Sequence, residues 1–474
     1  MKINRLFAAS GLLAALLVLA GCSVAPEYRA PSAPVPAAYK ESGTWKAAEP
    51  SEQLARGQWW SAFGDAGLDA LVQQATEANQ SLKAATARLK QARAMHEAAR
   101  AGLFPSADAN LGPTRVKPSA ASQGLPQGGQ AAPQTLWKAQ AGISYEVDLF
   151  GRVASTVDAA SADTQRSEAL FRSVQLALQA DVAETYFTIR ALDTEAALFR
   201  QTVDLREQAL ALLQRRFDEG AIGELDVARA TAELETARSD AMAVARLRAA
   251  SEHALAVLLG KAPAQFTLAP APLKPVSLRI PPGLPSSLLE RRPDIAAAER
   301  AMAAANARVG VARSAYFPSL TLNAAGGLES GSFGDLFKWS SRSFALGPLA
   351  GALSIPLFDG GRRSGELAGA RARYEEDVAN YRQQVLLAFR EVEDNLSELR
   401  FLEEQTASQA KAGKASDQAS RLAQLQYSEG AVNYLDVIDA ERGALQSRRA
   451  AAQLQGSQAV ATVRLVRALG GGWQ

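Results

Sequence analysis

Apolar residues alternate with polar residues or glycine over residues 137–149 of the chain. Side chains two positions apart point to the same face of a β-strand, so this pattern predicts a strand with one apolar and one polar face. Its length matches the ~9 to 11 residues with which a tilted strand crosses a bilayer. We therefore expect a strand at about residues 135–150. The apolar positions are Trp137, Ala139, Ala141, Ile143, Tyr145, Val147 and Leu149.

Short sequence repeats indicate three further strands. Phe-Pro-Ser at residues 104–106 recurs at 317–319, and Leu-Phe-Gly-Arg at 149–152 is echoed by Leu-Phe-Asp-Gly-Gly-Arg at 357–362. The second half of the chain therefore repeats the plan of the first. We expect four strands in all, the other three at about residues 104–112, 317–328 and 343–358.

Four strands are too few to close a barrel. Unpaired backbone groups at a sheet edge in lipid cost several kcal/mol each, so a spanning sheet must close on itself. Several subunits would then share one barrel: two copies would give eight strands, and three would give twelve and room for a lumen. The alternative is a soluble four-stranded sheet packed on the helices of one chain.

Prolines delimit two long segments that can be helical. None of the 21 prolines lies between Pro133 and Pro263, or after Pro356. Because proline breaks a helix interior, we expect helices at about residues 152–217 and 361–427. At ~1.5 Å per residue, each helix would be on the order of 100 Å long, which a compact domain does not need.

The second of these helices carries a coiled-coil pattern. Its apolar positions follow mostly alternating steps of four and three, which is typical of a left-handed coiled coil. The polar Asn395 interrupts the series at one core position. The apolar positions are Tyr374, Val378, Tyr381, Val385, Ala388, Val392, Leu399 and Leu402.

The stretch at residues 215–230 recurs at residues 425–441 with a constant offset of 210 (427 − 217). This offset predicts two tandem copies of one unit, each with a helical hairpin whose tip lies here, at residues 217–226 and 427–439. The glycine of each tip suits a left-handed helix C-cap, and Asn433 suits the N-cap of the following helix. The matched pairs are Phe217 and Tyr427, Gly220 and Gly430, Leu225 and Leu435, Asp226 and Asp436, and Val227 and Val437.

The N-terminus has the features of an export signal. Lys2 and Arg5 precede a short apolar run that ends in Leu-Ala-Gly-Cys, so we expect residues 1–21 to be a cleaved signal peptide. The ending resembles the bacterial lipoprotein box, in which the cysteine, here Cys22, is lipidated and becomes the first residue. Ser23 after the cysteine resembles the class that is sorted to the outer membrane. A diacylglycerol and an N-acyl chain together anchor a protein stably in a membrane.

Composition divides the rest of the chain. Residues 22–57 are rich in proline and are expected to form an extended, lipidated strap. The first tandem copy follows at residues 58–262, and the second at residues 291–474. Residues 263–290 between them contain a run of prolines and are expected to be an irregular connector.

Charge and residue chemistry exclude several classes of function. Lys and Arg number 51 against 49 Asp and Glu, a formal net charge of +2 with no basic block, which argues against nucleic acid as a partner. Cys22 is the only cysteine, and His96 and His253 lie apart in helix-like stretches, so no metal site is predicted. The sequence contains no serine-hydrolase elbow, phosphate loop or zinc-protease helix. We expect no enzyme and no cofactor beyond the covalent lipid on Cys22.

Several motifs together resemble the TolC-type outer-membrane factor family, in particular its lipoprotein branch of the NodT and OprM kind. The resemblance covers essentially the whole chain after the signal peptide. The motif Glu-Arg-Arg-Pro-Asp-Ile at residues 290–295 is the most specific internal one. The other carriers are the segments at residues 19–31, 58–82, 296–322, 427–441 and 468–473.

The resemblance implies an α+β membrane protein. Family members are homotrimers in which four strands per chain form a twelve-stranded β-barrel in the outer membrane. A periplasmic α-helical barrel of long coiled-coil helices continues the tunnel and is belted by a mixed equatorial region. They act as passive exit ducts for drugs or other small molecules, and their partners are a periplasmic adaptor protein and an inner-membrane efflux transporter, here expected to be of the RND type.

The resemblance also implies a gate, because the family's periplasmic entrance is closed at the hairpin tips. By position, Leu435 would form an apolar ring and Asp439 an acidic ring. Tyr427 and Asp436 would lie near contacts between protomers, and Asp226 is the counterpart of Asp436 in the first copy. Carboxylates in the first turn of a helix are also favoured by the helix dipole, by ~0.3 to 1 kcal/mol each, so a purely structural role is the alternative.

Two tip positions depart from this pattern. Some family members carry a basic residue two positions after the tip glycine, where this chain has Val432, so a salt bridge at that position is not carried over. Arg229 takes the place of Asp439 in the first copy and is close enough along the helix to pair with Asp226.

The sequence is also compatible with three other functions. The chain could be the outer-membrane duct of a type I protein-secretion system, or a structural envelope lipoprotein with a coiled-coil stalk that conducts nothing. A duct for metal efflux is also possible, although the sequence offers no cluster of soft ligands.

Overall fold

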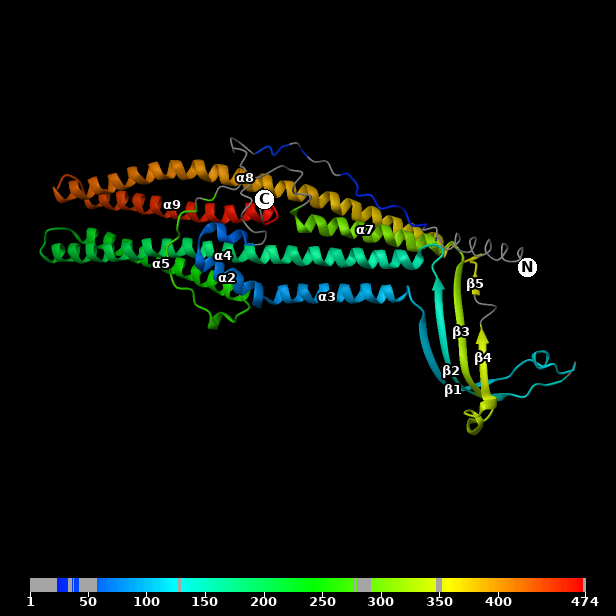
Figure 1. Ribbon diagram of the computed structural model, residues 1–474. Coiled ribbons are helices and arrows are strands. Elements are labelled where there is room, and N and C mark those ends of the chain that lie inside the picture. The colour runs from blue at the N-terminus through cyan, green and yellow to red at the C-terminus, as the bar shows by residue number, and fades with distance from the viewer. Residues whose placement is uncertain are drawn as a thin grey trace. The chain divides into compact units, whose positions relative to one another are not determined.

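The computed structural model describes residues 24–32, 36, 38–41, 58–126, 129–276, 278, 291–346 and 352–471 (Figure 1). The predicted signal peptide, Cys22, much of the strap and the second half of the connector lie outside the described residues. The chain divides into two compact units. Unit 1 comprises Met1–Ser32, Arg88–Glu168 and Ala297–Tyr381, and unit 2 comprises Ala33–Ala87, Ala169–Ala296 and Arg382–Gln474.

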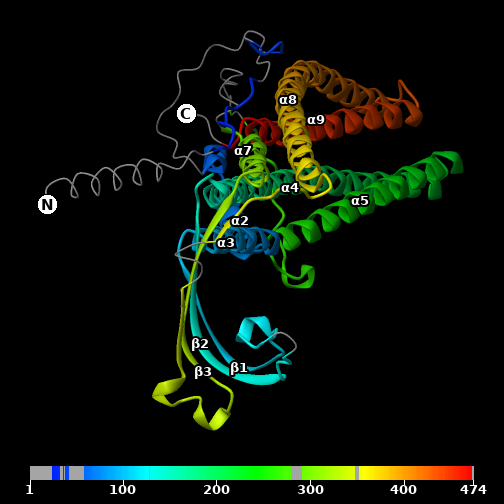
Figure 2. The same cartoon turned by 90° about the vertical axis from the view of Figure 1, so that its right-hand side faces the viewer.

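Unit 1 contains one antiparallel sheet, and Figure 2 shows β1, β2 and β3 side by side along a curved ribbon. The strand order is β1-β2-β3-β4, and β5 pairs with the same strand, β3, as β4 does. The segments are β1 (Ser106–Val116), β2 (Gln134–Val147), β3 (Ser319–Ser330), β4 (Arg342–Leu346) and β5 (Ala352–Ser354).

The strand ends differ from the predicted bounds for local reasons. The predicted strand at 135–150 stops at Val147 because the Asp148 carboxylate accepts hydrogen bonds from the amides of Val153 and Ala154, at 3.0 and 2.7 Å, and so starts the next helix. The first strand extends to Val116, beyond the predicted end at 112.

The predicted fourth strand, 343–358, requires a correction. The structure has two segments, β4 and β5, in its place, and residues 347–351 between them are outside the described part of the chain. The strand ends at Ser354 and does not continue to 358. Pro356 lacks the N–H that a ladder requires, which explains this end.

The helices of unit 1 belong to α3 (Gln80–Ala101), α7 (Pro293–Ser314) and the first turns of α4 and α8. The described part of the strap lies on α7: Tyr28 donates a hydrogen bond to the Glu299 carboxylate at 2.5 Å, and Asn306 donates to the Pro26 carbonyl at 2.8 Å. An added Cβ at Gly310 would lie 2.7 Å from the Ala25 Cβ. The strap therefore approaches the helix closely where glycine leaves room.

Unit 2 holds the two helical hairpins (Figure 1). The helices are α4 (Arg152–Asp218) with α5 (Glu224–Leu258), and α8 (Arg362–Ser428) with α9 (Tyr434–Ala468). The predicted long helices at 152–217 and 361–427 thus differ from α4 and α8 by single residues. No helix in the described part of the chain is both long and apolar enough to cross a membrane. The shorter α2 (Ala66–Ala78) completes the unit.

The coiled-coil pattern of α8 needs one correction. Val385, Ala388 and Val392 are buried as expected, but the next core position is Leu396, which is fully buried. The step from Val392 is four residues, so the polar Asn395 lies beside the apolar seam and not in it. Its side-chain amide donates to the Glu391 carbonyl one turn earlier at 2.6 Å.

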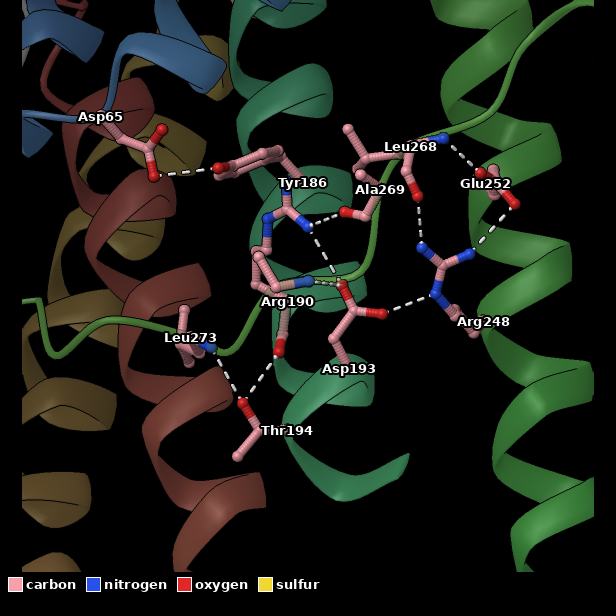
Figure 3. A network of polar contacts seen from close by, with 11 residues as sticks. Asp65, Tyr186, Arg190, Asp193, Thr194, Arg248, Glu252, Leu268, Ala269 and Leu273 are labelled. Carbon is pink, nitrogen blue, oxygen red and sulfur yellow. Dashed lines mark hydrogen bonds and ion pairs between the residues drawn. The ribbon is translucent and has the colours of Figure 1, made fainter. Parts of the chain in front are cut away.

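A buried polar network fixes the first part of the connector against the first hairpin (Figure 3). Asp193 of α4, 4% exposed, accepts from Arg190 at 3.0 Å and from Arg248 of α5 at 2.6 Å. The same carboxylate accepts from the Ala271 amide at 3.0 Å, and Arg248 donates to the Leu268 carbonyl at 2.6 Å. The buried charges therefore bond to one another and to the connector backbone, as buried charges require.

Candidate functional site

The two hairpin tips of unit 2 have the same backbone turn. Gly220 and Gly430 adopt φ values of 73° and 72°, the left-handed region that favours glycine. The amide of Ala221 donates to the Arg216 carbonyl at 2.8 Å, and that of Ala431 to the Gln426 carbonyl at 2.8 Å. These bonds satisfy the last carbonyls of α4 and α8, and each chain segment then turns back into α5 or α9.

Asp436 and Asn433 form a capping box at the start of α9. The Asn433 side chain accepts from the Asp436 amide at 3.2 Å, and the Asp436 carboxylate accepts from the Asn433 amide at 3.1 Å. In the first copy the N-cap is Gly223, without a side-chain cap, and Asp226 lies 3.8 Å from Arg229. The contacts of both predicted gate carboxylates are thus local, as the alternative structural interpretation expects.

Tyr427 joins the two tips. Arg216 of α4 donates a hydrogen bond to the Tyr427 hydroxyl at 3.2 Å, and its guanidinium carbon lies 5.8 Å from the centre of the Tyr427 ring. The ring of Tyr434 lies 5.6 Å from that of Tyr427. Burial and the negative charge of Glu441 raise the pKa of Tyr434 to about 12, so this phenol stays neutral at physiological pH.

Leu435 and Asp439 present their side chains to solvent. Leu435 is 37% exposed, which is high for a large apolar side chain. The Asp439 side chain is 64% exposed, and its carboxylate lies 3.7 Å from the guanidinium of Arg442. Both side chains are therefore free to contact a further surface at the tip.

A cluster of three charged residues connects the hairpins behind the tips; we call Arg206, Glu233 and Arg442 the tip clamp. Glu233 of α5 is 6% exposed and lies 2.8 Å from Arg206 of α4. Arg442 of α9 donates to the same carboxylate from its Nε at 2.8 Å. The hydrogen bond to Glu233 raises the pKa of Arg442 above its ordinary value. One buried carboxylate thus ties the second hairpin to the first.

Comparison with known proteins decides the family. The model of the outer membrane efflux protein family matches residues 71–261 and 284–471, one match in each half of the chain. The chain belongs to this family. The resemblance to TolC-type outer-membrane factors that the motifs indicated is thereby confirmed, and the protein is an outer-membrane efflux protein.

Full-length relatives agree with the match. The chain is 34% identical to the antibiotic efflux pump outer membrane protein ArpC of Pseudomonas putida, over 96% of this chain and 94% of that protein. It is 31% identical to the cation efflux system protein CusC of Escherichia coli O157:H7, over 97% of each. The structure of the open state of the Neisseria gonorrhoeae MtrE outer membrane channel matches with a TM-score of 0.82 at 30% identity, over 95% of this chain and 98% of that one.

Sequence reasoning did not find the tip clamp or Arg216 in this efflux protein. A signal was present in the tandem alignment, because the clamp residues occupy positions where the copies differ. At the offset of 210, Arg442 matches Ala232, Glu233 matches Gly443, and Arg206 matches Ser416. An ion pair between two copies of a repeat needs a residue in one copy whose counterpart in the other copy is different. Positions near the tips where the copies differ in charge are therefore candidates for contacts between the hairpins. Within the described residues, no group of three or more His, Cys, Asp and Glu side chains is arranged to hold a metal ion.

Proposed function

We propose that three copies of this chain form one twelve-stranded barrel in the outer membrane, continued by a barrel of the long helices. The observation that carries the proposal is the pair of open sheet edges. In the described residues, β1 pairs only with β2, and β4 and β5 pair only with β3. Such edges cannot face lipid, and pairing β1 of one chain with β4 and β5 of the next removes all of them.

The pairing register supports a membrane-spanning wall. Residues directly opposite in antiparallel strands share a face, so the register sorts the sheet into two faces. One face carries mainly charged, amide and hydroxyl side chains, which suits a water-filled lumen. The other is mainly apolar, which suits lipid. The first contains Asp108, Asn110, Lys138, Gln140, Glu146, Asn323 and Glu329, and the second Leu111, Trp137, Ile143, Tyr145, Leu320, Leu328 and Phe344.

In this proposal the protein is the passive exit duct of a tripartite efflux system, not an enzyme. A periplasmic adaptor protein and an inner-membrane transporter of the RND type deliver the substrate. ArpC is named for antibiotics and CusC for cations, so relatives of similar identity serve different cargoes. We infer that the pump selects the substrate and that the duct passes drugs or other small molecules. The lipid on Cys22 anchors each subunit in the outer membrane.

The hairpin tips are the proposed periplasmic gate. Leu435 and Asp439 line the entrance, Tyr427 joins the two tips, and Asp436 and Asp226 fix the start of the return helix in each tip. The exposure of Leu435 and Asp439 supports this assignment, as does the Arg216 to Tyr427 contact between the hairpins. The Neisseria gonorrhoeae MtrE outer membrane channel has been solved in an open state, which supports a tip that can change its arrangement.

The test is the conductance of the purified, lipidated protein in planar bilayers, together with its mass by native mass spectrometry. We expect a three-chain particle that conducts, with a current that rises in Asp439→Ala because one ring of charge is lost from the entrance. A non-conducting particle would favour the structural lipoprotein, and an unchanged current in the variant would contradict the role of Asp439. A deletion strain that loses secreted proteins but keeps its drug resistance would favour type I secretion.

A further inference from the structure

Arg342, at the start of β4, places a cation on the mainly apolar face of the sheet. Arg342 lies opposite Leu328 in the register, and Leu328 lies opposite Ala139, so all three share the face proposed to contact lipid. Phe344 shares this face, because its ring occupies the space over Gly326: an added Cβ there would lie 3.2 Å from the Phe344 Cδ2. A charge in an apolar membrane face is costly at the midplane, and the cost falls toward the interface.

Arg342 lies at the interface end of the strands. The β2 and β3 pairing ends at Trp137 and Ser330, two residues beyond the level of Arg342. The opposite end of β2, at Val147, leads into α4, so the Trp137 end of the strand is the end away from α4. In the proposed barrel this end faces the outer leaflet.

Aromatic residues surround this position, as they do at the interfaces of outer-membrane barrels. The Trp137 and Phe333 ring centres are 4.9 Å apart, and Phe337 stacks edge-on against Phe333 at 6.4 Å. Trp339 and Phe344 are 76% and 73% exposed, and exposed apolar patches mark sites that contact a membrane or a partner. We call these five residues the outer aromatic cluster.

The local structure holds Arg342 in place and leaves its charge free. Its Nε donates to the Trp339 carbonyl at 2.8 Å, and its guanidinium carbon lies 3.1 Å from the centre of the Trp339 ring. The short helix that carries Trp339 is itself fixed, since Ser341 donates to the Asp335 carbonyl at 2.7 Å. Of the residues that the structure describes, no carboxylate forms an ion pair with Arg342. Its terminal nitrogens are left to bind an anion.

A hollow of about 550 Å³ lies beside this guanidinium, and Gly326, Trp339, Arg342 and Phe344 are among its lining residues. Its surroundings combine one fixed cation with exposed aromatic rings, which matches a ligand that has an anionic group next to an apolar body. A planar guanidinium pairs well with phosphate, often through two parallel hydrogen bonds.

We propose that Arg342 and the outer aromatic cluster form a binding site for the phosphate of an outer-leaflet glycolipid of the lipid A type. Arg342 binds the phosphate, Trp339 covers the sugar, and Phe344 contacts the acyl chains. The site would fix the height of the barrel in the outer leaflet. This inference rests on the proposed barrel, because it requires the apolar face to contact lipid.

The test is binding of lipid A to the delipidated full-length protein in detergent, measured by native mass spectrometry. Dephosphorylated lipid A is the matched ligand. Lys138→Gln is the matched protein control, since Lys138 lies one residue from the level of Arg342 but on the polar face, 3.3 Å from Glu329. We expect Arg342→Gln to weaken lipid A binding by about tenfold, the loss typical of a hydrogen bond to a charged group, and Lys138→Gln to leave it unchanged.

Arg342→Lys should give intermediate affinity, because it keeps the charge but not the bidentate geometry. Equal binding of lipid A and its dephosphorylated form, or unchanged binding in Arg342→Gln, would overturn the inference. Equal affinity for phosphatidylglycerol would overturn its glycolipid specificity. Subunit number and bilayer conductance of the same samples separate the two proposals: a conducting trimer without phosphate-dependent binding contradicts this inference alone, whereas a non-conducting monomer contradicts the barrel.

Discussion

Arg442 of the second hairpin donates to the carboxylate of Glu233 in the first at 2.8 Å, and that carboxylate is almost completely buried. Arg206 of α4 binds the same group. A buried carboxylate that loses one partner keeps its desolvation cost, so the hairpins are most stable in contact when all three residues are present. The tip clamp therefore opposes separation of the hairpins.

Removing Arg442 should favour the open entrance. Because the Arg442 side chain is more than half exposed, the loss is on the order of 1 kcal/mol, equivalent to about a fivefold shift in the population of open tips. Arg442→Ala is therefore expected to raise the mean current in planar bilayers. Arg448→Ala is the control, since Arg448 pairs with Asp417 of the same hairpin at 2.8 Å. A rise of equal size in both variants would contradict the role of the clamp.

The capping box predicts a local loss of order at the start of α9. Asn433→Ala removes the side chain that caps the helix, at a cost of about 1 kcal/mol. Amides in the first turn of α9 should then exchange hydrogen faster. The matching turn of α5 should keep its rate, because the substitution leaves its N-cap, Gly223, unchanged. Unchanged exchange at residues 434–438 would show that the cap does not stabilise this turn.

Gly430 and Gly413 should respond to alanine in opposite directions. Gly430 has φ 72°, where a Cβ costs about 1–2 kcal/mol, so Gly430→Ala should weaken the tip. Gly413 lies inside α8, and an added Cβ would sit 3.6 Å from the Ser447 Oγ, an ordinary contact. Gly413→Ala should therefore stabilise the helix, by about 0.5–1 kcal/mol. Hydrogen exchange of the second hairpin measures both effects, and changes of the same sign would contradict the prediction.

Asp294 makes the stability of the fold depend on pH. Burial opposes ionisation of its carboxylate, but hydrogen bonds and charge from Arg292 outweigh burial and lower the Asp294 pKa below its ordinary value. Gln384 donates to the same group at 2.7 Å. A lowered folded pKa means stability that is present above the unfolded pKa of about 3.9 and is lost as the pH falls through the folded value.

Asp294→Asn should consequently destabilise the protein at pH 6 more than at pH 3. Denaturant midpoints of the two proteins across this range measure the difference. A gap between wild type and variant that stays constant with pH would show that ionisation of Asp294 does not contribute.

The sequence predicts those parts of the fold that depend on a period or on a residue with a fixed backbone preference. Alternation around Ile143 indicated a strand, the absence of proline indicated α4 and α8, and a constant offset indicated matching tips at Gly220 and Gly430. Each of these signals is local. The ends of the elements depended on single side chains. Asp148 is an example, because it fits the alternating pattern as a polar strand residue although it caps the next helix.

These local signals could not predict contacts between segments that are distant in the sequence. Glu233 and Arg442 are 209 residues apart in the chain. In the sequence of its own helix, each looks like an ordinary charged residue of a solvent-exposed face. Their meeting depends on how the two hairpins pack, which periodicity does not determine. The shift of the α8 core from Asn395 to Leu396 has the same origin, because the partner helix decides which residue is covered.

Cross-linking between the two open sheet edges tests the central claim most directly. A cysteine at Ala345 in β4 is combined with single cysteines at each position of β1, residues 106–116. The control pair, Ala109→Cys with Ala141→Cys, lies in register within one chain. We predict that at least one β1 position gives linked trimers on a denaturing gel, while the control stays monomeric. A complete series that yields only single chains would contradict the shared barrel.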